Sequence, residues 1–494
     1  MCQTMIADQE IRKEKNRSHW PVLFLLSLAT AIELIDGTAL NISLPTIASD
    51  FNINLGTASW IPMVYFLTIS CLLLPFAKVI EKTGTRKVLF AGLFLFTASS
   101  YFCAISGRIE LLIFFRFLQA TGGAMMAAAV PAQVAIGFTP ETRGRALGII
   151  MGAGGLGLAA GPAIGGYITH FISWHWIFYI NIPIGIAGMA LTYFYLRPYC
   201  PIKRSNGFDY GGLLFMSLFM VSFLFLLTKG SEFGWSSPEI LATTAISGLA
   251  LAIFIFWERR SEDPILDMSI FTSWAFLLSA AFLLIFEIVL GGIEMVLPFY
   301  LEKVLEFTPD ISGLYMLIPP MIMIIAGPAG GLLSDYEGNR AVCSISAFIG
   351  IIAFAVFLIS LTSPNTIIYM VIALILFGMA IGAVASSGAS RIIEHSPKGL
   401  EITGSAISNL VFYIGMSLGT ALYTLVLQSG MADATTTNGN ISINDVSAYA
   451  FSSSMPYIYM FSLVLLSAAL LFALLVPDKT GQSKIDKIRN PPVP

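Results

Sequence analysis

Long apolar runs separated by short polar segments set the pattern of hydrophobic and polar positions along this chain. A run of roughly 17 to 25 apolar residues is long enough to cross the hydrocarbon core of a bilayer as an α-helix. The pattern therefore predicts an all-α polytopic membrane protein with fourteen membrane-spanning helices. The predicted spans are residues 20–44, 57–79, 88–105, 111–137, 143–170, 174–196, 209–228, 238–257, 273–302, 310–333, 341–361, 366–391, 402–427 and 455–476.

Composition and charge agree with a membrane protein. The mean hydropathy is +0.81 and only 11% of residues are charged, against roughly 25% in soluble globular domains. Most of the 26 lysines and arginines lie in segments on the side of the N-terminus; the exceptions are Arg108, Lys229 and Lys303 on the other side and Arg116 inside a span. By the positive-inside rule, both termini are cytoplasmic. We expect a multi-pass protein of a cell membrane, a bacterial inner membrane.

Other classes of function find little support. A net charge of −3 spread over many loops shows no nucleic-acid patch. No metal, phosphate-cradle or nucleophile constellation is apparent, which argues against an enzyme and against a cofactor. The longest external polar segment, 428–454, is either a solvated connector or a flexible flap, and the connector is the favoured reading.

Two cytoplasmic loops repeat one pattern. The chain reads AKVIEKTGTRK over 77–87 and GLLSDYEGNR over 331–340. Each has an acid three residues before a glycine, with an arginine within two residues after it. These residues are Glu81, Gly84 and Arg86 in the first loop, and Asp335, Gly338 and Arg340 in the second.

The repeat predicts two six-helix bundles, because transporters are often built from internal repeats. Two extra helices lie between them. The expected division is a cytoplasmic N-terminus at 1–19, an N-terminal bundle at 20–196, a linker with two extra spans at 197–272, a C-terminal bundle at 273–476 and a cytoplasmic tail at 477–494.

Five ionisable residues fall inside predicted spans: Glu33, Asp36, Arg116, Glu287 and Glu294. Such residues are costly in lipid, so each is a candidate functional group. Glu33 and Asp36 are three residues apart and share a helix face, where they could exchange a proton or form a structural polar pair. Arg116 lies at about the depth of Asp36, so a charge relation that changes with protonation is one reading and a structural role is the other.

Glu287 and Glu294 are seven residues apart, two turns along one face of the 273–302 span. They suit a cationic ligand or a second proton site, although Glu294 could also be an interfacial residue.

The stretch from Gly148 to Gly166 holds eight glycines and Pro162 within an apolar span. Gly157, Gly161 and Gly165 recur at every fourth position and make one smooth stripe, which lets a neighbouring helix approach closely. The stripe is either a packing surface alone or a bendable contact between two moving bundles.

These segments resemble the major facilitator superfamily, and within it the fourteen-span drug:proton antiporters. IDGTALNISLP (35–45) is similar to that branch's signature and places Asp36 at its membrane acid, with Asn41 also matching. FFRFLQATGGA places Arg116 at the arginine of the proton-coupling motif, and the 77–87 loop looks like the cytoplasmic gating loop. GLAAGPAIGG (157–166), which includes Gly166, is close to the antiporter motif, and WHWIFYINIPIG (174–185) is typical of the same branch.

The resemblance implies alternating access by rocking of the two bundles, driven by a proton gradient. Asp36, Arg116 and Glu33 would couple protons, and Glu287, Glu294 and Asn41 would face the substrate cavity. We expect a monomeric exporter of amphipathic compounds, cationic drugs among them, whose partners are protons, a small-molecule substrate and the lipid bilayer. A dedicated exporter of one metabolite, such as a siderophore, is the nearest alternative. A non-transporting membrane sensor or assembly partner is the rival from another class.

Overall fold

A computed structural model describes residues 20–196, 209–261, 264–266, 268–397, 400–437 and 443–477. Its regular secondary structure is entirely helical over those ranges, and 14 helical spans are long and apolar enough to cross a membrane. The predicted all-α polytopic fold class is therefore confirmed. The helices are α2 (Trp20–Asp50), α3 (Leu55–Ala58), α4 (Trp60–Thr83), α5 (Thr85–Ala104), α6 (Ile109–Gly137), α7 (Pro140–Phe171), α8 (His175–Tyr179), α9 (Asn181–Tyr195), α10 (Tyr210–Phe233), α11 (Pro238–Glu258), η1 (Met268–Thr272), α12 (Trp274–Lys303), α13 (Pro309–Glu337), α14 (Asn339–Ser360), α15 (Thr366–His395), α16 (Glu401–Thr437) and α17 (Ile443–Leu475).

Several helices run beyond the apolar runs that predicted them. The predicted connector at 428–454 is wrong for most of its length, because α16 continues to Thr437 and α17 already begins at Ile443. Once a helix is nucleated, each added residue gains a backbone hydrogen bond, so polar residues can extend it past the apolar core. The middle of this segment, 438–442, lies outside the described residues.

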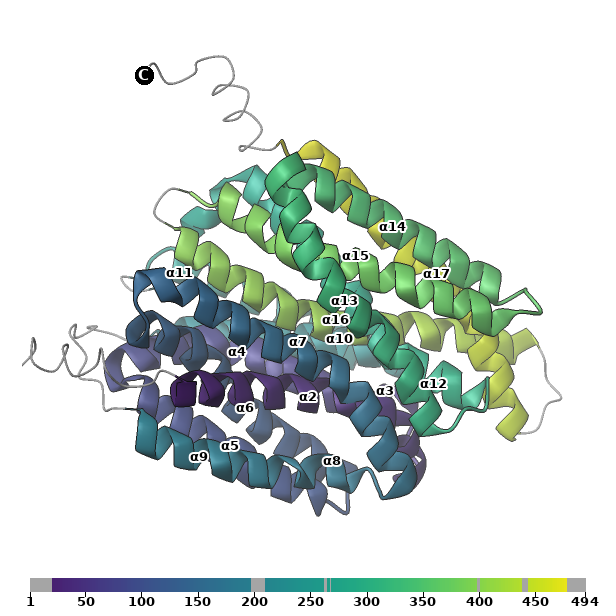
Figure 1. Ribbon diagram of the computed structural model, residues 1–494. Helices are drawn as coiled ribbons and strands as arrows, with labels where there is room; N and C mark the ends of the chain where they lie inside the picture. The colour runs from purple at the N-terminus through teal and green to yellow at the C-terminus, as the bar shows by residue number, and fades with distance from the viewer. Residues whose placement is uncertain are drawn as a thin grey trace, which may run out of the picture.

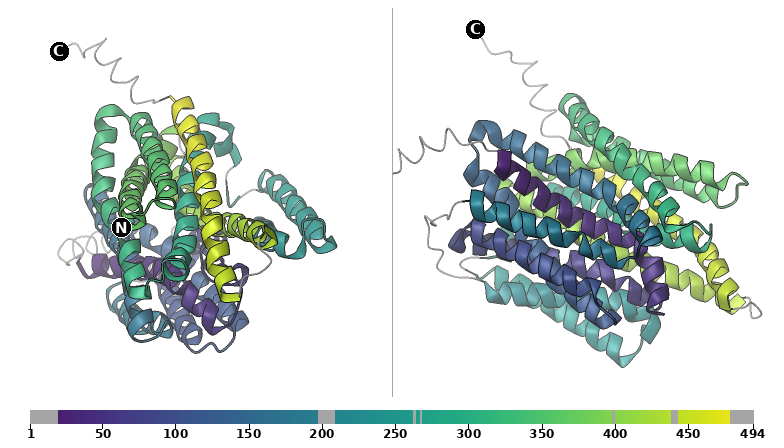
Figure 2. Two further views of the ribbon diagram at one scale, coloured as in Figure 1. Left: turned by 90° about the vertical axis from the view of Figure 1, so that its right-hand side faces the viewer. Right: turned by 60° about the horizontal axis from the view of Figure 1, so that its bottom comes forward.

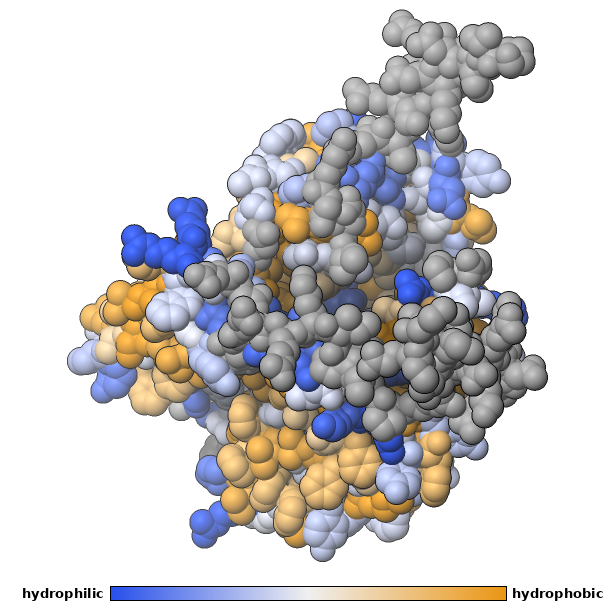
Figure 3. Space-filling view, turned by 90° about the vertical axis from the view of Figure 1, so that its left-hand side faces the viewer, coloured by the Kyte–Doolittle hydropathy of each residue, from blue (hydrophilic) through white to orange (hydrophobic). Residues whose placement is uncertain are grey.

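The helices form two bundles (Figure 1). The N-terminal bundle contains α2 to α9, and the C-terminal bundle contains α12 to α17. We call the end of the molecule where α2 begins the terminal end, and the opposite end, where α2 and α12 finish, the distal end. Figure 3 looks at the terminal end, where hydrophilic residues are scattered over the visible face and hydrophobic residues gather at its left and at its bottom.

The extra helices α10 and α11 pair at the side of the molecule (Figure 2). Leu224 of α10 packs in a buried cluster with Met63 and Leu67 of α4 and Ala421 of α16. The accessory pair therefore covers the seam where α4 of one bundle meets α16 of the other.

The two repeated loops have the same backbone geometry. Gly84 joins α4 to α5 with φ 85°, and Gly338 joins α13 to α14 with φ 90°. Positive φ is costly for residues that carry a Cβ atom, which explains why glycine stands at both positions. The acids of the two loops, Glu81 and Asp335, are exposed at the terminal end.

The arginines of these loops also occupy equivalent places. Arg86 donates to the backbone oxygen of Tyr193, 3.0 Å away on α9, and Arg340 donates to that of Leu474, 2.6 Å away on α17. Each loop is thus tied to the last helix of its own bundle.

Arg391 is the last residue of the predicted 366–391 span, but α15 continues past it to His395 and leaves the side chain only 1% exposed. Its guanidinium donates to the carbonyl oxygens of Ala473 (2.8 Å) and Val476 (2.5 Å). The last carbonyls of a helix have no partner within it, so Arg391 caps the end of α17.

The glycine stripe of α7 packs on α2 within the N-terminal bundle. A Cβ atom at Gly157 would lie 2.7 Å from the carbonyl oxygen of Ala31, one at Gly161 would strike Thr38, and one at Gly165 would strike the carbonyl oxygen of Ala39. The stripe is therefore a close contact inside one bundle and not the contact between the two.

The contact between bundles is made by neighbouring residues of α7. Gly166 abuts the carbonyl oxygen of Pro309, and Gly313 abuts that of Pro162. The small residues along α7 thus contact two helices, α2 along the stripe and α13 at the distal end.

Gly165→Ala should lower the thermal unfolding temperature of the purified protein, because the new methyl group meets a backbone atom that cannot turn aside. Overpacking of this kind costs about 1–3 kcal/mol. The matched control is Gly152→Ala on the same helix, where a Cβ atom would have nothing within 4 Å. Equal unfolding temperatures for the two variants would contradict the tight contact between α2 and α7.

Candidate functional site

A buried ion pair lies inside the N-terminal bundle. The Arg116 side chain on α6 and the Asp36 side chain on α2 are both fully buried, and Nη1 of Arg116 lies 2.5 Å from Oδ2 of Asp36. A buried cation needs a compensating partner, and Asp36 supplies it. Helix α2 presents Asp36 to α6 because the α7 stripe packs against a different part of the α2 surface.

The second oxygen of Asp36 accepts two further hydrogen bonds. Nε2 of Gln119 donates to Oδ1 over 2.9 Å, and Nδ2 of Asn181, the first residue of α9, donates to the same oxygen over 2.6 Å. Both amides also reach the hydroxyl of Ser100 on α5, at 2.8 Å and 3.5 Å. The carboxylate therefore accepts hydrogen bonds from α6 and α9. Ser100 of α5 accepts hydrogen bonds from the same two amides.

Arg116 has more donors than acceptors around it. Its Nη1 also donates to Oε1 of Gln119, 2.8 Å away, but Nε and Nη2 are buried without a hydrogen-bond partner. The guanidinium lies over the ring of Tyr65, 4.3 Å from the centroid, with the ring of Phe178 at 5.8 Å. Aromatic faces attract cations, so these rings offset part of the missing hydrogen bonding.

Three further members of this cluster, Gln119, Asn181 and Ser100, are not among the residues predicted from the sequence. These side chains carry no charge, so a search for ionisable residues in spans passes over them. The available signal was their polarity within apolar spans, with Gln119 three residues after Arg116 and Asn181 inside the WHWIFYINIPIG segment.

Glu33 does not join this cluster. Its Oε1 accepts a hydrogen bond of 2.8 Å from the hydroxyl of Tyr413 on α16, and its backbone oxygen accepts one of 3.1 Å from Tyr65. Although Glu33 and Asp36 are three residues apart, their carboxyl groups belong to different networks. Glu33 connects the two bundles, whereas Asp36 stays within one.

Two of the candidate cavity residues, Asn41 and Glu294, join α2 to α12. Nδ2 of Asn41 donates to Oε2 of Glu294 over 3.2 Å, which links the two bundles again. Glu287 lies nearer the terminal end of α12, directly beside Gly415 of α16. Oδ1 of Asn41 and Oε2 of Glu287 are buried without a partner. Both atoms can accept a hydrogen bond, so each is a possible contact for a donor group.

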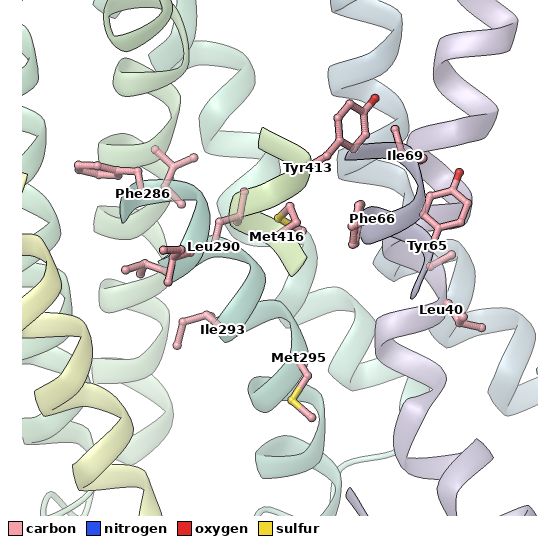
Figure 4. Packing of buried hydrophobic residues seen from close by; sticks show 14 of the residues in the cluster. Leu40, Tyr65, Phe66, Ile69, Phe286, Leu290, Ile293, Met295, Tyr413 and Met416 are labelled. Carbon is pink, nitrogen blue, oxygen red and sulfur yellow. The ribbon is translucent and has the colours of Figure 1, made fainter. Parts of the chain in front are cut away.

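Aromatic and sulfur-bearing side chains also lie where the two bundles meet. Figure 4 shows Tyr413 and Met416 of α16 beside side chains of α4 and α12, among them Phe66 and Leu290. The rings of Phe66 and Phe412 meet edge to face across the bundles, with centroids 6.5 Å apart. The interface therefore combines apolar surface with a few acceptors.

Further contacts join the bundles at the distal end. Nζ of Lys303 donates to Ser49 over 3.3 Å, and His170 lies 3.7 Å from Asp310. Together with the close approach of Gly166 to Pro309, these contacts hold the distal end of the two bundles together. The repeated loops with Glu81 and Asp335 lie at the opposite end.

Metal-binding groups are not found in the part of the chain that the structure describes: no three or more His, Cys, Asp or Glu side chains are placed to hold an ion there.

Known proteins similar to this chain are membrane transporters. A riboflavin transporter, RibZ, from Clostridioides difficile is 30% identical over 89% of this chain and 94% of its own length. A tetracenomycin C resistance and export protein from Streptomyces glaucescens is 26% identical over 84% of this chain and 77% of its own length. A multidrug resistance protein B homolog from Mycobacterium tuberculosis is 28% identical over 81% of this chain and 74% of its own length.

Solved structures share the fold. A bacterial homolog of the human lysosomal transporter Spinster, in an inward-facing and unoccupied conformation, superposes with a TM-score of 0.65 at 16% identity, over 92% of this chain and 96% of that one. A peptide transporter, POT, in complex with sulfate gives a TM-score of 0.64 at 16% identity, over 92% and 95%.

The relatives and the helical fold identify a multi-pass membrane transporter and not an enzyme, and the bacterial relatives point to the cell membrane. The profile of the Major Facilitator Superfamily matches residues 26–420. The chain therefore belongs to the major facilitator superfamily.

Proposed function

We propose that this transporter exports amphipathic compounds, cationic ones among them, in exchange for protons. The observation that carries the proposal is the fully buried pair of Asp36 and Arg116. Protonation of Asp36 removes the negative charge and leaves Arg116 as an uncompensated buried cation, which is strongly unfavourable. Proton binding would thereby destabilise the arrangement seen here and favour another one.

The arrangement of the bundles supports alternating access. If both termini are cytoplasmic, the distal end faces the exterior, and contacts such as Lys303 with Ser49 close that side. The loops that carry Glu81 and Asp335 then lie at the cytoplasmic side, where they would act as gating loops between the N-terminal bundle (20–196) and the C-terminal bundle (273–476). The linker at 197–272 supplies the accessory pair at the α4–α16 seam.

The interface between α2 and α12 is the proposed substrate site. Asn41 and Glu287 offer buried acceptor atoms without partners, and Glu294 adds a second carboxylate. An ammonium or other N–H group would satisfy these acceptors, while Phe66 and Tyr413 would contact an apolar ring. A cationic amphipathic molecule meets both requirements.

A dedicated transporter of one metabolite is the second candidate. It is favoured by the similarity to the riboflavin transporter, which extends over 94% of that relative. A flavin ring is planar and carries an imide N–H, so it too could use acceptors beside aromatic side chains. The two candidates share the fold and the coupling site and differ in the range of substrates.

Asp36→Asn should abolish proton exchange by proteoliposomes that carry an internal pH dye and are exposed to a panel of lipophilic cations, neutral drugs, a siderophore and riboflavin. The amide cannot release a proton, so the substrate-evoked signal should vanish while membrane insertion is kept. The matched control is Glu306→Gln, a similar charge loss at an exposed residue.

Signals from several unrelated cations would establish a multidrug exporter, and a signal from riboflavin or the siderophore alone would select the dedicated transporter. An Asp36→Asn variant that still exchanges protons at the wild-type rate would remove Asp36 from the coupling mechanism.

Glu287→Gln should weaken transport of cations selectively. Loss of one buried charge–donor contact is expected to raise KM for cationic substrates roughly tenfold or more, while a neutral substrate should change little. The measurement is the KM for one cation and one neutral compound of the panel. An equal effect on both would assign Glu287 to the structure of α12 and not to charge recognition.

A further inference from the structure

The segment from Trp174 to Asn181 contacts α2 at two carboxylates. At the distal end, Nε1 of Trp174 donates to Oδ2 of Asp50 over 2.7 Å. At the level of the ion pair, Asn181 donates to Asp36 over 2.6 Å. Between them, Phe178 places its buried ring beside Arg116. One short segment thus touches both members of the ion pair and the end of the helix that carries Asp36.

Close packing holds Asn181 in place. Asn181 is 1% exposed. One turn further along α9, a Cβ atom at Gly185 would strike Oγ1 of Thr97 on α5, and one at Gly188 would lie 3.1 Å from Leu93. The start of α9 is therefore fixed against α5, so the Asn181 amide cannot easily withdraw from Asp36.

The two amides that reach Asp36 differ in their other contacts. Gln119 also accepts a hydrogen bond from Arg116, so its orientation depends on both charges of the ion pair. Asn181 contacts Asp36 and Ser100 through its donor atom Nδ2. A donor stabilises the ionised carboxylate and offers nothing to a protonated one.

We infer that Asn181 is a positioning residue that sets the pH at which Asp36 takes up its proton. This inference rests on the proposed function, in which Asp36 is the coupling carboxylate. Without the donor, Asp36 takes up a proton at a higher pH.

Other ionisable groups also face this region. Arg116 and Tyr65 lie nearest to Asp36, Cys103 approaches Gln119 from α5, and Glu33 lies on the adjacent part of α2. Further ionisable groups on helices packed against α2 include Glu287 and Glu294 on α12, His170 on α7, His175 on α8 and Asp310 on α13, and Tyr413 of α16 bonds to Glu33. The test must therefore measure the protonation of the Asp36 carboxyl group itself.

Infrared difference spectroscopy of the purified full-length protein in lipid, titrated from about pH 5 to about pH 10, can do so. The carboxylic acid C=O band that disappears in Asp36→Asn reports protonated Asp36. In Asn181→Leu, which removes the donor at similar volume, this band should develop with a midpoint about one pH unit higher than in the wild type. The matched control is Thr192→Val on the same helix, where the buried hydroxyl bonds only to the carbonyl oxygen of Gly188.

An unshifted midpoint in Asn181→Leu would overturn the inference, as would an equal shift in Thr192→Val. The absence of an Asp36 band from both the wild type and Asn181→Leu would overturn the inference as well. Without the Asn181 donor, Asp36 is expected to become protonated within the titrated pH range. The titration requires no transport, so failure of the proposed function would show separately as a wild-type protein whose Asp36 titrates but whose substrates evoke no proton exchange.

Discussion

The burial of one arginine organises the N-terminal bundle. Arg116 is fully enclosed, and its charge can be tolerated only with a carboxylate and aromatic faces around it. Asp36 from α2, Tyr65 from α4 and Phe178 from α8 meet this need. Four helices are thereby fixed relative to one another by a single charge, and Asn181 adds the start of α9. A change in the charge of Asp36 or Arg116 would therefore alter contacts of all these helices.

Helix α2 stands between this charge and the second bundle. The glycine stripe of α7 holds α2 at close range, which fixes its rotation about its own axis. One part of its surface then presents Asp36 to Arg116, and other parts present Glu33 to Tyr413 and Asn41 to Glu294. Under the proposed function, a shift of α2 that relieves Arg116 would also move the residues that join the bundles, because α2 is one continuous helix.

The sequence predicted the fold well because lipid imposes long apolar helices, which are read directly from composition. The approach of Asp36 to Arg116 could be expected from their matching depth. Helical periodicity, however, could not separate Glu33 from Asp36, since residues three apart share a face and only the neighbouring helices decide their partners. Gln119 and Asn181 escaped notice because a neutral amide matters only once a carboxylate lies beside it.

The two polar regions beside α2 lack opposite kinds of hydrogen-bond partner. Arg116 retains two buried donor groups without acceptors, whereas Asn41 and Glu287 retain buried acceptors without donors. The helix keeps these groups apart, so they cannot satisfy each other. Under the proposed function, a proton on Asp36 removes an acceptor for Arg116. A cationic substrate would donate hydrogen bonds to the unpartnered acceptors of Asn41 and Glu287. The exchange of one for the other would then follow from hydrogen-bond balance across a single helix.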